Sequence, residues 1–151
     1  MATIGFSGGA LLDAKLREIA DRLGKSASVD VGFHPDANYA DGVQPVAMVA
    51  AIQNYGAPEA GIPARPFFSE MVRENSPNWG KELAGMLVAE DYDGVRALRS
   101  MGEVIAGQLA ESITQANFVP LAPATVARKG FSAQLIDTGT MRNSIKPVVK
   151  E

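Results

Sequence analysis

The sequence predicts an α+β fold, in which several helices, one of them long, pack against a small antiparallel sheet. Apolar residues recur at helical spacing in several segments, whereas strand-like alternation is confined to two or three short ones. Helices and strands do not alternate strictly, as a parallel sheet would require. With 151 residues, 46% apolar and 21% charged, the chain resembles one ordinary globular domain. We expect a single domain over residues 1–151, with an extended loop at residues 56–66 and a loop or arm at residues 117–136.

The first helix is expected at residues 10–23. One apolar residue recurs every three or four positions, which forms a single apolar face, and charged residues occupy most of the remainder. These apolar residues are Leu12, Leu16, Ile19 and Leu23. Gly24 follows as a typical helix end.

The first strand is expected at residues 29–33, where apolar residues alternate with polar or small ones. Pro35 ends it, because proline lacks a backbone donor for the ladder. Residues 39–42 form either a short return strand or a turn. A second helix is expected at residues 45–55, since its first residue is proline, and Gly56 follows as its end.

The segment at residues 56–66 is the most unusual one. Three prolines and two glycines among its eleven residues predict the absence of regular structure. Residues that precede proline are also pushed towards extended conformations. We expect an extended, semi-rigid loop in which Arg65 is held between Pro63 and Pro66.

Two further helical regions are expected after this loop. Residues 67–72 resume helical spacing, and Ser76 with Pro77 indicates a fresh helix start, after which apolar residues continue at intervals of four. A turn at residues 91–94 precedes the longest expected helix, at residues 95–113. Its apolar face extends over about five turns.

The C-terminal region is expected to hold only short elements. Residues 124–130 could form one helical turn, and Asp137 or Thr138 could cap a short helix at residues 139–144. Residues 145–149 read as a strand, which the proline within it restricts to a sheet edge.

The composition excludes several classes of chemistry. The chain has no cysteine and one histidine, His34, which excludes disulfides, thiol catalysis, iron–sulfur clusters and cysteine–histidine zinc sites. His34 lies at a strand end without a fixed partner in the sequence, so we interpret it as a polar terminus. We therefore expect no catalytic residues, no metal and no cofactor.

Charge and hydropathy limit the partners. The net charge is -3 and the basic residues are scattered, so we expect no specific binding of nucleic acid. The longest apolar stretch, at residues 45–52, is too short to span a bilayer, and the first residues lack the basic start of a secretory signal. We expect a soluble chain that is made in the cytoplasm and does not bind membranes.

Two short motifs imitate ligand sites and fail at named positions. Residues 24–26 end like a phosphate-binding loop, but the glycine required five residues before Gly24 is Ile19. The acidic turn at residues 91–93 suggests a calcium loop, but its first and last ligand positions are Ala89 and Ser100. A helix end and a helix cap explain these segments better.

A third motif resembles the catalytic carboxylate of an aspartic protease. Asp137, Thr138 and Gly139 follow two apolar residues, and a dimer would let two such carboxylates share one proton. Only 14 residues follow Asp137 in the 151-residue chain, which leaves no room for a flap and later strands. A dimeric hydrolase that uses Asp137 is kept as an alternative to a helix cap.

The loop at residues 62–68 is the candidate contact surface. A proline-stiffened loop loses little conformational freedom on binding, and arginine and aromatic residues are common in interface hot spots. The candidate residues are Pro63, Arg65, Pro66, Phe67 and Phe68. The alternative that the two phenylalanines belong to the core and that Arg65 clamps local carbonyl groups stays open.

A set of ordered segments carries a family resemblance. They are Tyr-Ala-Asp-Gly at residues 39–42, Gln-Asn-Tyr-Gly-Ala at 53–57, Ile-Pro-Ala-Arg-Pro-Phe-Phe at 62–68, Pro-Leu-Ala-Pro-Ala-Thr at 120–125, and Leu-Ile-Asp-Thr-Gly with Met-Arg-Asn-Ser-Ile within 135–145. Together they resemble the neck and tail-completion (head–tail connector) proteins of long-tailed bacteriophages, including the virion morphogenesis proteins of Mu-like phages. The resemblance covers roughly residues 29–149. The sequence departs from it at residues 53–55, where the usual acid is missing, and at Met141, where leucine is usual.

The resemblance implies an α+β fold and a structural task in the virion without catalysis. Such proteins form sixfold or twelvefold rings of identical copies at the head–tail junction or tail end, and they contact neighbouring connector or tail proteins. It adds Asp137, Thr138 and Arg142 to the candidate contact residues. DNA is expected to pass through the ring, and an acidic lumen would repel it. A tail terminator that caps the tail tube and a cytoplasmic assembly chaperone are the alternatives.

Overall fold

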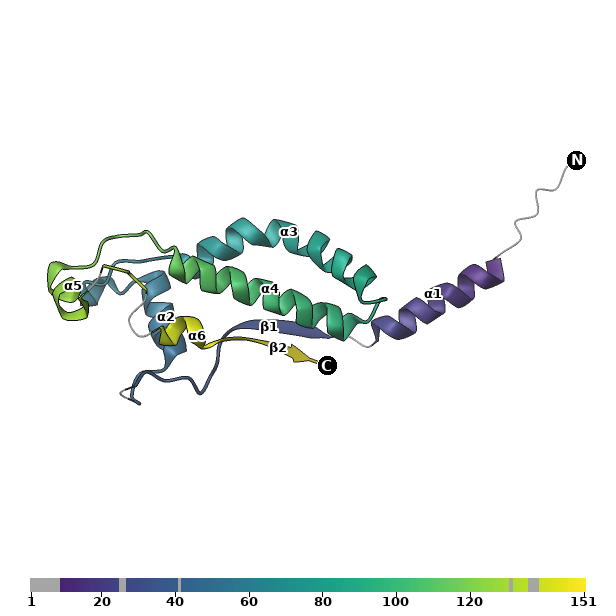
Figure 1. The fold of residues 1–151 in the computed structure, drawn as a ribbon, viewed down its shortest axis with the longest axis horizontal. Helices are drawn as coiled ribbons and strands as arrows, with labels where there is room; N and C mark the ends of the chain where they lie inside the picture. Colours follow the sequence, from purple (N-terminus) through teal and green to yellow (C-terminus); the bar gives the residue numbers. More distant parts are fainter. Residues whose placement is uncertain (1–8, 25–26, 41, 131, 136–138) are drawn as a thin grey trace, which may run out of the picture.

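The fold is an α+β arrangement with a small sheet, as the sequence predicts. Within the described residues the chain forms six α-helices and a two-stranded antiparallel sheet. The elements follow one long axis, with α1 (Gly9–Leu23) towards one end and α5 (Pro123–Lys129) at the other (Figure 1). The computed structural model describes residues 9–24, 27–40, 42–130, 132–135 and 139–151.

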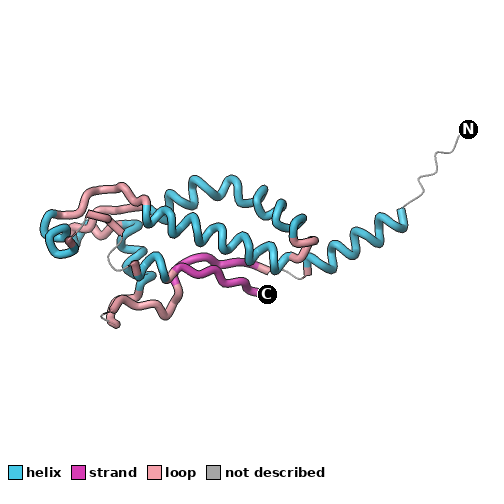
Figure 2. The backbone as a smooth tube through the Cα atoms, in the orientation of Figure 1, coloured by secondary structure: helices cyan, strands magenta, loops and turns pink. Residues whose placement is uncertain are grey.

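Two long helices and the sheet form three layers (Figure 1). α3 (Phe67–Ala89) and α4 (Gly94–Thr114) run antiparallel, and α4 lies between α3 and the strands. β1 (Ser28–Phe33) pairs with β2 (Ile145–Lys150), so strands from the first and the last quarter of the chain form one sheet (Figure 2). α4 therefore contacts both outer layers and is the central element.

The register of the strands accommodates the proline in β2. Val31 is opposite Pro147, and the backbone N–H of His34 donates to Ser144 O at 2.9 Å. Hydrogen-bonded and non-hydrogen-bonded pairs alternate in an antiparallel ladder. Since His34 and Ser144 form a hydrogen-bonded pair, Val31 and Pro147, three positions further on, form a non-hydrogen-bonded one. The backbone N–H that Pro147 lacks would therefore not take part in the ladder, and the sheet loses no hydrogen bond at this position.

α4 approaches the sheet most closely at Gly102. A Cβ atom at this position would lie 2.7 Å from Pro147 Cβ and 2.8 Å from Val29 Cγ2. Both distances are shorter than van der Waals contact, and the position is buried. Glycine therefore sets how tightly the helix packs on both strands.

The hydrophobic core lies where α2 (Val46–Tyr55), α6 (Thr140–Asn143) and the adjoining ends of α3 and α4 meet. At its centre Phe67 is fully buried, and its ring meets that of Phe33 edge to face at a centroid distance of 6.4 Å. The buried cluster comprises Val46, Ala50, Phe67, Met71, Leu109, Ile113, Leu135 and Met141.

Most elements with strong local signals begin and end close to their predicted positions. Gly24 and Gly56 follow the first two helices with φ angles of 72° and 76°. The side chain of Asp93 accepts a hydrogen bond from Arg96 N at 2.9 Å and so caps α4. Of the two alternatives for residues 39–42, the described ones favour a turn, flanked by a single bridge between Asn38 and Pro45.

The expected helix start at Ser76 and Pro77 was wrong. α3 continues through both residues without interruption, with Pro77 inside it. Its 23 residues also make it longer than α4, with 21, which was expected to be the longest helix. Proline does not end α3, because apolar side chains on both sides of it pack towards α4 and β1. α3 is arched in Figure 1, and an internal proline is a common cause of such bending.

The expectation that residues 56–66 contain no regular structure was also wrong in part. Pro58–Ala60 form a 3₁₀ turn, and Ala57 bridges to Ile62 in both directions. Gly61, with a φ angle of 67°, lets the chain reverse between these residues. The segment is thus a small closed loop followed by a short extended stretch.

Candidate interaction surfaces

Arg65 acts as a clamp from inside the proline-rich loop. Only 5% of the residue is exposed. Its guanidinium donates to Gln53 Oε1 at 2.8 Å and to Val119 O at 3.3 Å, and its backbone N–H donates to Gln53 O at 2.7 Å. Arg65 therefore ties the loop to the end of α2 and to the segment that follows α4.

The other candidate residues of the loop differ in exposure. Phe67 belongs to the core, whereas Pro66 and Phe68 are half-buried and Pro63 is exposed. Of the side chains proposed for contact, Pro63 and parts of Pro66 and Phe68 are therefore accessible to a partner. Arg65 and Phe67 support the loop from beneath.

The C-terminal candidates are described only in part. Asp137 and Thr138 lie outside the described residues. Gly139, with a φ angle of 77°, directly precedes α6, and Arg142 on that short helix is exposed. The short helix expected at residues 139–144 is thus confirmed, while the contact role of Arg142 remains a proposal.

Asn54 fixes the junction of α2 and α3, and sequence reasoning missed it. The side chain is buried, and its Oδ1 accepts the backbone N–H groups of Phe68 and Ser69 at 3.0 and 3.1 Å. Its Nδ2 donates to Ser69 Oγ at 2.8 Å. Two otherwise unpaired donors of the first turn of α3 are thereby satisfied from another helix. Local cap patterns do not reveal a cap that is 14 residues away in sequence.

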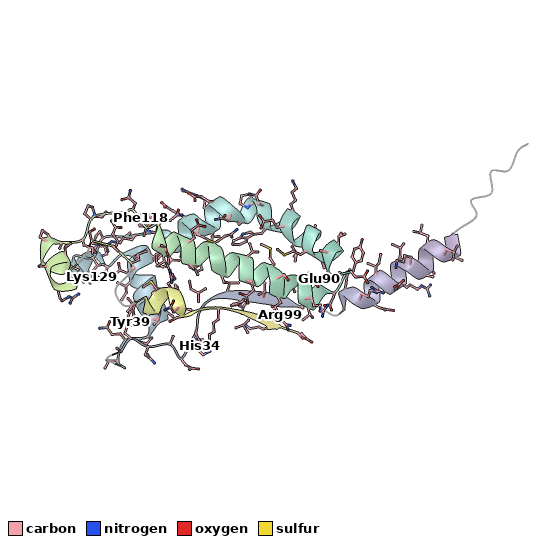
Figure 3. The ribbon with its side chains drawn as sticks, in the orientation of Figure 1. His34, Tyr39, Glu90, Arg99, Phe118 and Lys129 are labelled. Carbon is pink, nitrogen blue, oxygen red and sulfur yellow. The ribbon has the colours of Figure 1, made fainter. Side chains whose placement is uncertain are left out.

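Three of the side chains labelled in Figure 3, His34, Glu90 and Lys129, lie far apart along the molecule. His34 is on the loop that follows β1, while Glu90 and Lys129 lie towards opposite ends. His34 Nδ1 accepts a hydrogen bond from the backbone of Asp36 at 3.3 Å, which is a local contact. Within the described residues no group of three or more histidine, cysteine, aspartate or glutamate residues is placed to hold a metal ion.

One surface pocket is polar. It has a volume of about 450 Å³ and lies between the first half of α3 and the second half of α4. Glu70, Glu74 and Glu111 line it together with amide and hydroxyl side chains. Its acidic character would favour a basic group over DNA or another anion.

A second, smaller pocket is apolar. It has a volume of about 180 Å³ and lies between β1, α3 and α4. Small-molecule sites usually measure roughly 300–1,000 Å³ and include a few polar groups that orient the ligand. This pocket has neither property, but it can accept aliphatic side chains. It is lined by Val29, Val31, Phe68, Met71, Val72, Trp79, Ile105 and Leu109.

α1 projects from the body (Figures 1 and 2), and most of its apolar face is exposed. None of its 15 residues is buried. Leu12, Leu16 and Leu23, on the predicted apolar face, are 59%, 56% and 40% exposed, and the adjacent Leu11 is 80% exposed. Ile19, nearer the body on the same face, is half-buried. The sequence predicts the apolar face correctly, but the structure shows that its outer part, at Leu12 and Leu16, is left largely uncovered by the described chain.

Most charged side chains of α1, in contrast, form ion pairs. Glu18 accepts from Lys15 at 2.9 Å and from Arg22 at 2.8 Å, and Arg17 pairs with Asp13 at 2.9 Å. The Lys15 ammonium, and to a lesser degree Arg22, holds the pKa of Glu18 below its usual range. The largest exposed feature of α1 within the described structure is therefore its apolar stripe, at Leu12, Leu16 and Leu23.

Comparison with known proteins identifies no relative. No protein-family model matches the chain, and neither the curated proteins nor the solved structures contain a match. Among the described helices, none combines the length and the apolar character needed to cross a bilayer.

Proposed function

We propose that this protein is a structural component of a long-tailed bacteriophage particle, a neck or tail-completion protein that acts by assembling into a ring. The order of its motifs supports this, since the loop at residues 62–68 and the ending at residues 135–145 both resemble that family. Neighbouring connector or tail proteins would be its further partners. With a net charge of -3, a ring of such chains would let DNA pass without holding it.

The uncovered apolar face of α1 is the observation that carries the proposal. An isolated helix of about 12–15 residues is marginally stable in water, and tertiary packing of its apolar face is what normally stabilises it. Leu11, Leu12 and Leu16 are each more than half exposed, so this part of α1 lacks that packing within the described part of the chain. An assembly in which another protein covers the face supplies it.

The test is the composition of the virus particle. Particles produced from the genome that encodes this chain are purified through a density gradient and analysed by quantitative mass spectrometry. We expect about six or twelve copies of the chain in each particle, measured against a particle protein of known copy number. Its presence in the lysate but absence from the particles would contradict the proposal and favour an assembly chaperone.

The aspartic hydrolase alternative has its own readout. It requires proteolytic activity that disappears in the Asp137→Asn variant while assembly persists. The structural proposal instead expects no activity in either protein, and incorporation of both into particles.

A further inference from the structure

We infer that α1 of one copy inserts its leucine stripe into the apolar pocket between β1, α3 and α4 of the next copy. The inference rests on the proposed self-assembly, and it holds wherever in the particle the assembly sits. It assigns the stripe and the pocket to each other as the two halves of one interface.

The two surfaces match in chemistry. The stripe presents aliphatic side chains along one side of a 15-residue helix, about 22 Å long at 1.5 Å per residue. All the side chains that line the pocket are apolar, and its volume of about 180 Å³ suits aliphatic side chains better than a ligand. An amphipathic helix that lays its apolar face in an apolar groove is a recurring mode of protein recognition.

The attachment of α1 prevents it from filling the pocket of its own chain. A Cβ atom at Gly94 would lie 2.6 Å from Leu23 O, so the end of α1 sits directly on the start of α4. Arg22 pairs with the Asp91 carboxylate and reaches Asp91 O at 3.4 Å, which ties the same end to the α3–α4 turn. The rest of α1 points away from the body (Figure 1). Leu12 is about 16 Å along the helix from Leu23, on the part of α1 that projects away from the body and its pocket.

A second copy of the chain is the partner that the observations favour. A stripe on one side of the molecule and a pocket on another form a head-to-tail contact, and such contacts close into rings when the rotation permits. The charged residues of α1 balance, with three acidic and three basic side chains. Helices that lie on anionic membranes are rich in Lys and Arg on the polar face, and a neutral helix lacks that attraction.

Disulfide trapping tests the pairing directly, because the natural chain has no cysteine. Full-length Leu16→Cys and Val72→Cys proteins, carrying tags of different size, are mixed under oxidising conditions. We expect a mixed disulfide, identified by its mass, that is at least several-fold more abundant than with Ala14→Cys in place of Leu16→Cys. Ala14 is exposed on the opposite side of α1 and serves as the matched control.

The same design identifies failure. No excess of the mixed disulfide over the Ala14→Cys control would overturn the inference, and so would a disulfide formed within one chain by the Leu16→Cys, Val72→Cys double variant. If the natural chain is oligomeric under these conditions, such a result leaves the proposed self-assembly intact. If the natural chain is a monomer throughout, self-assembly fails as well.

Charge substitution supplies a second readout. We expect Leu16→Glu to weaken self-association by roughly tenfold or more, because it places a charge where an apolar side chain would be buried. Ala14→Glu adds the same charge to the opposite side of α1 and should change association little. Neither position is in the core, so both variants should keep the fold of the natural chain, which far-UV circular dichroism checks. Equal association of the two variants would contradict the docking.

Discussion

At the scale of single residues, a few side chains set how the elements meet. Asn54 is the clearest example, because one buried amide satisfies two backbone donors of the first turn of α3. The helix begins after Pro66, which provides no side-chain cap of its own. The cap must therefore come from α2, and the two helices are fixed to each other.

Asn54→Ala should lower the free energy of unfolding by about 1–3 kcal/mol, because it leaves buried N–H groups without an acceptor. Asn54→Asp keeps the acceptor and adds a negative charge at the helix N-terminus, so it should retain most of the stability. Urea unfolding of both variants measures this. Tyr55→Ala, at the 74% exposed neighbouring position, is the control. Equal loss in Asn54→Asp and Asn54→Ala would argue against the capping role.

Gly102 is the second residue whose role can be tested. Gly102→Ala should destabilise the protein by about 1–3 kcal/mol, because the added methyl group meets Pro147 and Val29. Gly107, on the same helix, has open space around it, so Gly107→Ala should instead stabilise by about 0.5–1 kcal/mol. Thermal unfolding of the two variants measures this. The packing predicts a lower unfolding temperature for Gly102→Ala and a higher one for Gly107→Ala, and a change of the same sign in both would contradict it.

At the scale of elements, the continuity of α3 shows packing overriding a local signal. Ser76 followed by Pro77 has the form of a helix start, yet α3 passes through both. Trp79 lies one turn beyond Ser76, where its ring lines the apolar pocket and its Nε1 donates to Gln108 Oε1 on α4 at 2.9 Å. Such contacts between helices stabilise the turn of α3 around Pro77, although proline provides no backbone N–H there.

Pro77→Ala tests this balance. Proline in a helix interior is about 3 kcal/mol less favourable than alanine, and Pro77 is exposed, so the substitution should stabilise the protein by up to about that amount. Pro147→Ala, in β2, is the contrasting variant. The ladder uses no backbone donor at that position, so alanine would add no hydrogen bond there. A lower urea midpoint for Pro77→Ala would show that α3 needs the proline for its shape.

Local signals explain why much of the fold could be predicted from the sequence. The apolar spacing of α1, the alternation in β1 and the glycines that follow α1 and α2 all act over a few residues. What could not be predicted depends on contacts between distant segments. The cap from Asn54 and the burial of Arg65 against Val119 are of this kind.

At the scale of the whole molecule, the structure makes α1 a stronger candidate contact surface than the proline-rich loop. The loop was predicted because arginine and aromatic residues stand between prolines, but two of its five candidate residues are buried. The sequence predicts the apolar face of α1, but it does not indicate whether other elements cover that face. Only the placement of α1 relative to the other elements distinguishes them (Figure 1).

The central claim is that this chain is built to assemble with copies of itself. Native mass spectrometry of the purified full-length protein, over a range of concentrations, tests it most directly. We predict one closed oligomer whose mass is six or twelve times that of the 15.9 kDa chain. A monomer of 15.9 kDa at every concentration would contradict the account.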